Sequence, residues 1–289
     1  MSRGKSSAMA ILLVSPDGML GHAFALALAS RGEPVRAVSY PEIDLRDDGS
    51  IARSLAIRPR LVINCAAYTD VDGAETHELE ADEVNGHGVG RLARACAAAG
   101  AKLVHFGTDY VFAGDASTPY AVDAPIAPRT AYGRSKALGE AMLRGAGAEH
   151  LYVRTSWLYA PWGKNFVRTI AKAADARPEL KVVDDQRGRP TSAEGLVKTT
   201  LALLDAGAAG TFHATDEGEC TWFELASFVV EARGAKARVV PCTSAEYPSR
   251  TPRPRYSVLD LSRTHALVGP GTHWREAVRD VLARLAPLG

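Results

Sequence analysis

The chain has 289 residues, of which 46% are hydrophobic and 23% charged, as expected of a globular protein that buries a substantial core. Its 34 Lys and Arg residues nearly balance 33 Asp and Glu residues, which argues against nucleic acid as the principal partner. The apolar run at residues 8–14 is far shorter than the roughly 20 residues of a membrane-spanning helix, so no membrane association is expected.

The N-terminal leader and the cysteines indicate the compartment. Residues 1–7 are small and polar, lack the apolar core of a secretory signal, and are expected to form a disordered tail. The four cysteines, Cys65, Cys96, Cys220 and Cys242, show no metal-binding spacing and fit reduced, buried thiols. A cytoplasmic protein without a metal site is therefore expected.

Short apolar segments alternate with helical patterns in the first half of the chain. Strands are predicted at residues 11–14, 35–38, 61–66, 103–106 and 151–153. Helices are predicted between several of them, at residues 21–30, 85–99 and 131–144. This alternation predicts an α/β fold with a doubly wound parallel (Rossmann) sheet, whose strands are apolar throughout because both faces are covered.

The pattern changes after Trp157. Helices are predicted at 164–176, 192–206 and 273–285, a strand at 181–183, and a long surface loop at 241–255. Thr221 and Glu224 form a capping box at the start of another helix. The chain is therefore divided into a sheet domain, 9–160 with a returning segment at about 190–216, and a smaller mixed α/β domain, 161–189 and 217–286.

A glycine-containing loop follows the first predicted strand, with the sequence Ser15-Pro16-Asp17-Gly18-Met19-Leu20-Gly21. Glycine allows close approach to the backbone, and the N-terminus of the next helix attracts a diphosphate. A tight structural turn would also use two glycines, but the strand before and the helix after favour a dinucleotide. The residues expected to bind it are Ser15, Gly18, Met19, Leu20 and Gly21.

The second predicted strand indicates which dinucleotide is bound. In dinucleotide-binding folds this strand usually ends in an acidic residue that binds the ribose of NAD. Ser39 stands at that place here, so the 2′-phosphate of NADPH should be tolerated and even preferred. Asp44 and Leu45, a little further on, are expected near the adenine.

Tyr132 and Lys136 lie four residues apart, hence on one face of a helix. A free tyrosine, with a pKa of about 10, is a poor acid or base at neutral pH. A nearby lysine cation lowers that pKa and can hold a ribose. Alone, the pair would more often be a surface coincidence, but Thr108 at a preceding strand end supplies a hydroxyl to orient a carbonyl. The three residues predict reduction of a ketone.

Six further segments carry a specific resemblance. They are residues 64–75 (NCAAYTDVDGAE), 107–112 (GTDYVF), 132–136 (YGRSK), 154–159 (RTSWLY), 185–191 (DQRGRPT) and 253–257 (RPRYS). In order and spacing the chain resembles the extended short-chain dehydrogenase/reductase family, and within it the dTDP-4-dehydrorhamnose reductases. The similarity runs over nearly the whole chain. It implies a sheet domain that binds the dinucleotide and a smaller domain that binds a sugar nucleotide.

The resemblance also implies roles for single residues. Thr108, Tyr132 and Lys136 would be the catalytic set, and Tyr132, Lys136, Ala66, Ala67 and Tyr68 would line the cofactor. The substrate would be contacted by Tyr68, Thr69, Val71, Thr108, Asp109, Tyr110, Trp157, Arg187 and Arg255. The two arginines suit a diphosphate, although they could equally be solvated loop charges. Ser15 departs from the family's glycine; it fits if its φ stays negative, and it could weaken cofactor binding.

The implied function is reduction of the C4 ketone of dTDP-4-dehydro-L-rhamnose by NADPH or NADH. A 4,6-dehydratase would have an Asp-Glu pair after the threonine, whereas Tyr110 follows Asp109 here. Reduction of another dTDP-4-keto-6-deoxysugar and a non-catalytic regulatory subunit remain alternatives. The resemblance alone raises Mg²⁺ as a cofactor. A monomer or a homodimer is expected.

Overall fold

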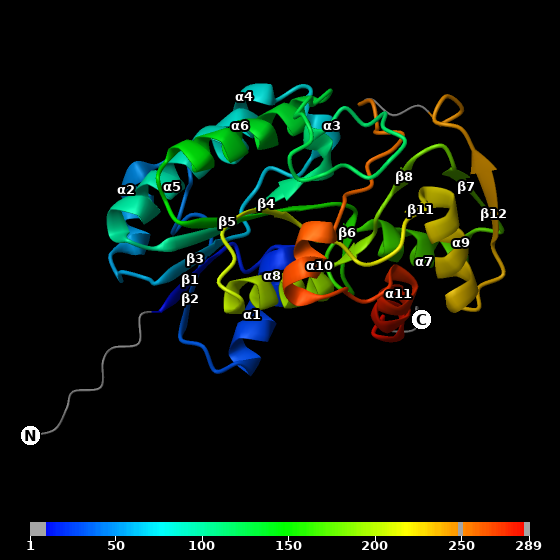
Figure 1. The fold of residues 1–289 in the computed structure, drawn as a ribbon. Helices are drawn as coiled ribbons and strands as arrows, with labels where there is room; N and C mark the ends of the chain where they lie inside the picture. The colour runs from blue at the N-terminus through cyan, green and yellow to red at the C-terminus, as the bar shows by residue number, and fades with distance from the viewer. Residues whose placement is uncertain (1–9, 248–250, 286–289) are drawn as a thin grey trace, which may run out of the picture.

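A six-stranded parallel sheet forms the centre of the molecule (Figure 1). The computed structural model describes residues 10–247 and 251–285, so the predicted tail at residues 1–7 lies outside the described residues. The strand order is β10-β5-β4-β3-β1-β2, and every neighbouring pair is parallel. The strands are β1 Ile11–Val14, β2 Val35–Val38, β3 Leu61–Asn64, β4 Lys102–Thr108, β5 His150–Thr155 and β10 Gly210–His213. The predicted fold class is confirmed.

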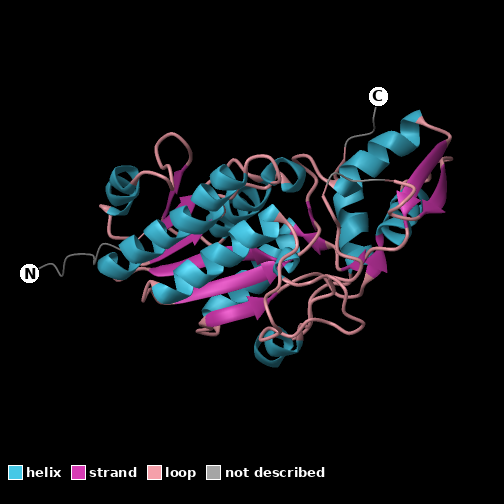
Figure 2. Ribbon diagram, turned by 90° about the horizontal axis from the view of Figure 1, so that it is seen from above, coloured by secondary structure: helices cyan, strands magenta, loops and turns pink. Residues whose placement is uncertain are grey.

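Helices cover both faces of this sheet (Figure 2). One face carries α1 Met19–Ser30, α8 Ala193–Asp205 and α10 Ser262–Val268. The other carries α2 Asp48–Leu55, α5 Gly88–Ala99 and α6 Ala131–Gly145. Because both faces are covered, all residues of β1 and β3 are buried. Strand order reverses between β1 and β3, the place where open α/β sheets bind ligands.

A second hydrophobic core lies beside the sheet (Figure 1). It is built from helices α7 Phe166–Ala176, α9 Trp222–Ala232 and α11 Trp274–Ala283 and from the parallel strands β7 Glu179–Val183 and β12 Arg238–Cys242. The capping box predicted at the start of α9 is confirmed, because the Thr221 and Glu224 side chains each bind the other's backbone N–H. The amphipathic helices α7 and α11 bury one face each in this core.

Two pairs of short strands lie outside the six-stranded sheet. β6 Leu158–Tyr159 runs parallel to β9 Thr191–Ser192, and β8 Arg187–Gly188 runs antiparallel to β11 Cys220–Thr221. The proposed division at residue 160 falls just after β6. α10 lies in residues 217–286, which were predicted to belong to the smaller domain. It packs instead against the sheet domain, on helix α8 and strand β10.

Several local predictions need correction. The loop predicted at 241–255 begins inside β12, because residues 238–242 pair with β7, and residues 248–250 lie outside the described part. The helix predicted at 85–99 starts as a π-helical turn, Glu83–His87. Further elements were not predicted: α2, β10, α10, the one-turn helices α3 Val71–Ala74 and α4 Glu78–Asp82, and the 3₁₀ turn Asp109–Val111.

Candidate active site

A cavity of about 660 Å³ opens at the carboxyl edge of the sheet, where the strand order reverses. Its walls come from the ends of β1, β3, β4 and β5, from α6 and from the loop before α7. The predicted site residues that line it are Ser15, Gly18, Met19, Leu20, Ala66, Ala67, Thr69, Val71, Thr108, Asp109, Tyr110, Tyr132, Lys136 and Trp157. The fold thus brings the predicted phosphate loop and the predicted catalytic set to one cavity.

The phosphate loop connects β1 to α1 and is closed tightly on itself. A Cβ on Gly21 would lie 1.9 Å from the carbonyl oxygen of Ser15, so only glycine fits at that position. The Gly18 N–H donates to the same carbonyl at 3.3 Å. α1 begins without a side-chain cap and without an acidic residue in its first turn, so its N-terminal N–H groups are left for an anion.

Ser15 corrects one expectation. It adopts φ +58°, in the left-handed region that favours glycine, so the condition that its φ stay negative is not met. The reason lies in its neighbours: its N–H donates to Val38 at the end of β2, while its carbonyl meets Gly18 and Gly21. The loop therefore keeps a glycine-like conformation with a serine in it.

Seven predicted ligand residues do not line this cavity: Gly21, Ser39, Asp44, Leu45, Tyr68, Arg187 and Arg255. Ser39 follows β2 and donates from Oγ to Oδ1 of Asp17 at 2.7 Å, and it is Asp17 that lines the cavity. Asp44 accepts hydrogen bonds from Arg46, and Leu45 is buried against Gly88. The Tyr68 N–H donates to Asn85, and its ring packs with a small cluster of buried alanines.

The predicted catalytic residues meet at the start of α6. Thr130 caps this helix by accepting from the Gly133 N–H, which places Tyr132 in its first turn. Lys136 is buried and donates from Nζ to the Phe106 carbonyl at 2.7 Å. Thr108 donates from Oγ1 to Oδ1 of Asp109 at 3.0 Å. A threonine has one hydroxyl proton, so Thr108 cannot donate to a substrate while it donates to Asp109.

Burial shifts the pKa of each of these groups. It raises the pKa of Tyr132, and the Asp109 charge raises it further, against a hydrogen bond with Thr108 that lowers it. Burial also lowers the pKa of Lys136 to about 8 and raises that of Asp109 to about 6. The expected lowering of the tyrosine pKa by Lys136 is not found, because burial dominates and the ammonium binds a main-chain carbonyl. Without ligands, Tyr132 is held as the phenol.

Aromatic rings form the wall that faces the second core. Trp157 has φ +48° and stacks on Trp222 with ring centroids 3.6 Å apart and planes 10° apart. A Cβ on Gly188 would lie 2.6 Å from the Trp157 ring, so β8 supports the ring from behind. Tyr110 meets Tyr132 edge to face at 5.7 Å. Flat apolar walls of this kind suit a sugar or a base.

The two predicted diphosphate arginines lie outside the cavity. The Arg187 guanidinium lies 3.6 Å from Glu219 and 3.5 Å from Glu224, which reach it because β8 pairs with β11. Arg255 lines a smaller neighbouring hollow together with Arg253. Arg253 itself is bound to Asp72 and to the Tyr110 hydroxyl, at the margin of the main cavity.

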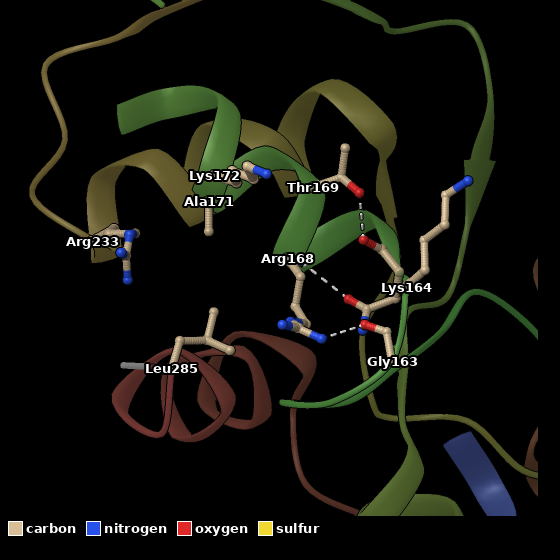
Figure 3. Close-up of a pocket in the computed structure, with 9 residues that line it drawn as sticks. Gly163, Lys164, Arg168, Thr169, Ala171, Lys172, Arg233 and Leu285 are labelled. Atoms are coloured by element: carbon tan, nitrogen blue, oxygen red, sulfur yellow. Dashed lines mark hydrogen bonds between the residues drawn. The ribbon is translucent and has the colours of Figure 1, made fainter. Parts of the chain in front are cut away.

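Several residues that line the cavity were not predicted from the sequence, among them Asp17, His105, Ser156 and Lys164. Lys164 follows a glycine in the loop before α7, a position with no motif to mark it. It lines both the cavity and an adjoining hollow of about 400 Å³ (Figure 3). There Arg168 donates to the Gly163 carbonyl at 2.6 Å, while the Lys164 side chain extends away from Arg168 and Arg233 (Figure 3). Lys164 thus lines the cavity next to Gly163, which lies against Met19 at the start of α1, and its ammonium can meet an anion there.

Over residues 10–247 and 251–285, no group of three or more His, Cys, Asp and Glu side chains could hold a metal ion, so Mg²⁺ rests on resemblance alone. No helix within these same ranges has both the length and the apolar character needed to cross a membrane.

Comparisons with known proteins cover nearly the whole chain. A family model described as the RmlD substrate binding domain matches residues 9–286. A dTDP-4-dehydrorhamnose reductase of Mycobacterium tuberculosis is 41% identical over 282 residues, covering 94% of this chain and 92% of that protein. A dTDP-4-keto-6-deoxy-D-glucose reductase of Streptomyces niveus is 39% identical over 272 residues, covering 92% and 94%. A crystal structure of dTDP-4-dehydrorhamnose reductase from Bacillus anthracis in complex with NADP is 32% identical, with a TM-score of 0.92 over 95% of this chain and 99% of that one.

Proposed function

This chain belongs to the RmlD substrate binding domain family, and we propose that it reduces the C4 ketone of dTDP-4-dehydro-L-rhamnose to dTDP-L-rhamnose. The observation that carries the proposal is the single cavity shared by an uncapped helix N-terminus, for a nucleotide diphosphate, and by Thr108, Tyr132 and Lys136. The cofactor is a nicotinamide dinucleotide, which supplies the hydride when bound.

The chain's own residues then divide the remaining work. Tyr132 donates its proton to the oxygen that gains charge as the ketone is reduced. Thr108 holds that oxygen once its hydroxyl turns from Asp109 to the substrate. Lys136 keeps two N–H groups beyond the one bound to Phe106, enough to hold a ribose and to stabilise the phenolate that Tyr132 leaves behind.

The sugar nucleotide lies against the aromatic wall. Trp157 and Tyr110 offer flat faces beside the catalytic tyrosine, and Thr69 and Val71 line the cavity close to them. Lys164 is a stronger candidate for a phosphate contact than Arg187, because it lines the cavity and Arg187 is held by two carboxylates. A contact between Arg255 and the substrate diphosphate stays a prediction that rests on the family resemblance alone.

The test is a spectrophotometric assay. NADH and NADPH are each supplied with dTDP-4-dehydro-L-rhamnose, made in situ by the enzymes that precede this step, and loss of reduced-cofactor absorbance is followed. Turnover with formation of dTDP-L-rhamnose is expected. No oxidation of either cofactor would contradict the proposal, and binding of both ligands without turnover would point to a non-catalytic subunit.

One other substrate is favoured by a specific observation. The similarity to the Streptomyces niveus dTDP-4-keto-6-deoxy-D-glucose reductase is nearly as high as that to the dehydrorhamnose reductases. The two keto-sugars differ in ring stereochemistry and not in the group that is reduced. The same assay with dTDP-4-keto-6-deoxy-D-glucose therefore decides between them by the ratio of kcat/KM.

A further inference from the structure

Ser39 is the first residue after β2, where dinucleotide folds contact the adenosine ribose. This place adjoins the phosphate loop, because the Ser15 N–H donates to the Val38 carbonyl at 2.8 Å. The loop residue Asp17 reaches across the junction and accepts the Ser39 hydroxyl at 2.7 Å. A carboxylate therefore lies at the position of the ribose, although it comes from the loop after β1 and not from the end of β2.

The charge of Asp17 is not compensated. Across the described residues, Ser39 is the partner found for its side chain, and no Lys, Arg or His lies within ion-pair distance of it. The two arginines nearest to this end of β2 in sequence are already paired: Arg36 with Glu42 at 2.5 Å, and Arg46 with Asp44 at 2.8 Å. Neither of these two arginines is therefore free to receive an additional phosphate.

We propose that Asp17 is a specificity-determining residue that makes this chain prefer NADH to NADPH. The 2′-hydroxyl of NADH can donate to the free oxygen of this carboxylate. The 2′-phosphate of NADPH is a phosphate monoester with a charge of about −1.5 to −2 at neutral pH, and Asp17 repels it. Ser39 alone would favour NADPH; the carboxylate supplied by the loop reverses that preference.

The size of the expected preference for NADH over NADPH follows from how exposed Asp17 and Ser39 are to water. Asp17 is exposed and Ser39 half-buried, so water weakens the repulsion. Two like charges about 4 Å apart repel each other by about 1 kcal/mol at the dielectric constant of water, which changes a dissociation constant roughly tenfold or somewhat less. The preference should also shrink with salt, because ions screen exposed charges over about 10 Å at 0.1 M ionic strength. A moderate, salt-sensitive preference is therefore expected, and not complete exclusion of NADPH.

The inference rests on the proposed use of a nicotinamide cofactor but not on the sugar, so binding alone tests it. The dissociation constants of NADH and NADPH are measured by fluorescence titration, at low and high salt, for the wild type, Asp17→Asn and Asp205→Asn. Asparagine keeps the acceptor for Ser39 and removes the charge. Asp205→Asn removes another exposed charge, one that is paired with Arg31, on a residue that does not line the cavity.

We expect the wild type and Asp205→Asn to bind NADH roughly tenfold more tightly than NADPH, and Asp17→Asn to lose this preference through tighter binding of NADPH. A wild type that binds NADPH as tightly as NADH would overturn the inference, as would an affinity ratio that Asp17→Asn leaves unchanged. If neither cofactor binds the wild type, the proposed function itself fails.

Discussion

Replacing Gly21 with alanine tests whether the tight phosphate loop is what binds the cofactor. The new Cβ would lie 1.9 Å from the Ser15 carbonyl oxygen and 2.7 Å from its carbonyl carbon. Side-chain carbons keep at least 3.0 Å from such atoms, so the loop backbone must move by more than 1 Å relative to α1. Ser15 has little room to yield, because its N–H is bonded to Val38 in β2.

A shift of this size separates the loop N–H groups from the diphosphate. Hydrogen bonds to a charged group contribute about 1.5–3 kcal/mol each, so loss of even one or two weakens cofactor binding by about 3 kcal/mol, or roughly a hundredfold in Kd. Overpacking should also cost about 1–3 kcal/mol of the free energy of unfolding. Cofactor affinity is read by fluorescence titration and stability by urea unfolding.

Gly18→Ala is the matched control. A Cβ there lies 3.6 Å from the Ser15 oxygen, an ordinary contact, and Gly18 has φ −75°, which alanine adopts freely. It should keep wild-type stability and bind the cofactor within a few-fold of the wild type. Equal cofactor affinities in the two variants would refute the argument that the close approach of Gly21 shapes the binding loop.

Three further changes probe the rest of the site. Tyr132→Phe should lower kcat by about 10²- to 10⁴-fold and leave the cofactor Kd unchanged, and a near-normal kcat would exclude Tyr132 as proton donor. Trp222→Leu removes the stack behind Trp157 and should raise KM for the sugar nucleotide by up to about tenfold, with the cofactor Kd as control; an unmoved KM would show that the stack does not position Trp157. Burial raises the pKa of Asp109 from 3.8 to about 6, so the folded state binds the extra proton. Unfolding scans should thus show wild-type stability falling by about 3 kcal/mol relative to Asp109→Asn as pH rises from about 3 to 7, and a constant difference would rule this out.

The parallel sheet could be predicted because its strands are buried on both faces. Strand segments that are apolar at every position, such as residues 11–14 and 61–63, are typical of the middle of a sheet whose two faces are both covered by helices. β10 carries no comparable signal, since its residues Gly210–His213 mix glycine, threonine and histidine. It joins the edge of the sheet through pairing with β5, a long-range contact that local pattern does not reveal. The helices α2 and α10 were also missed; both are short, with eight and seven residues.

The positions of the candidate site residues could be predicted best where a single element fixes them. Tyr132 and Lys136 share one helix face, and Gly18 and Gly21 lie at the start of α1. The location of Arg187 depended instead on partners more than 30 residues away, which β8 and β11 bring together. The Asp17 contact was missed for a related reason: it joins a loop after β1 to the end of β2, and only the parallel pairing of these strands sets that distance.

The electrostatics of the cavity also revise what the Tyr-x-x-x-Lys spacing implies. The motif alone indicates a tyrosine whose pKa is lowered by a lysine, which describes a base as well as an acid. In the folded chain, burial and the nearby Asp109 raise the pKa of Tyr132, so the phenol keeps its proton until a stronger acceptor arrives. The developing alkoxide of a reduced ketone is such an acceptor, since an alcohol is a weaker acid than a phenol. The charge of Lys136 matters after this proton transfer, because the buried phenolate that Tyr132 then carries is stabilised by a nearby cation. In the proposed reduction, burial and Asp109 therefore keep the proton on Tyr132 before the reaction, and Lys136 is the cation proposed to stabilise the phenolate formed when that proton leaves.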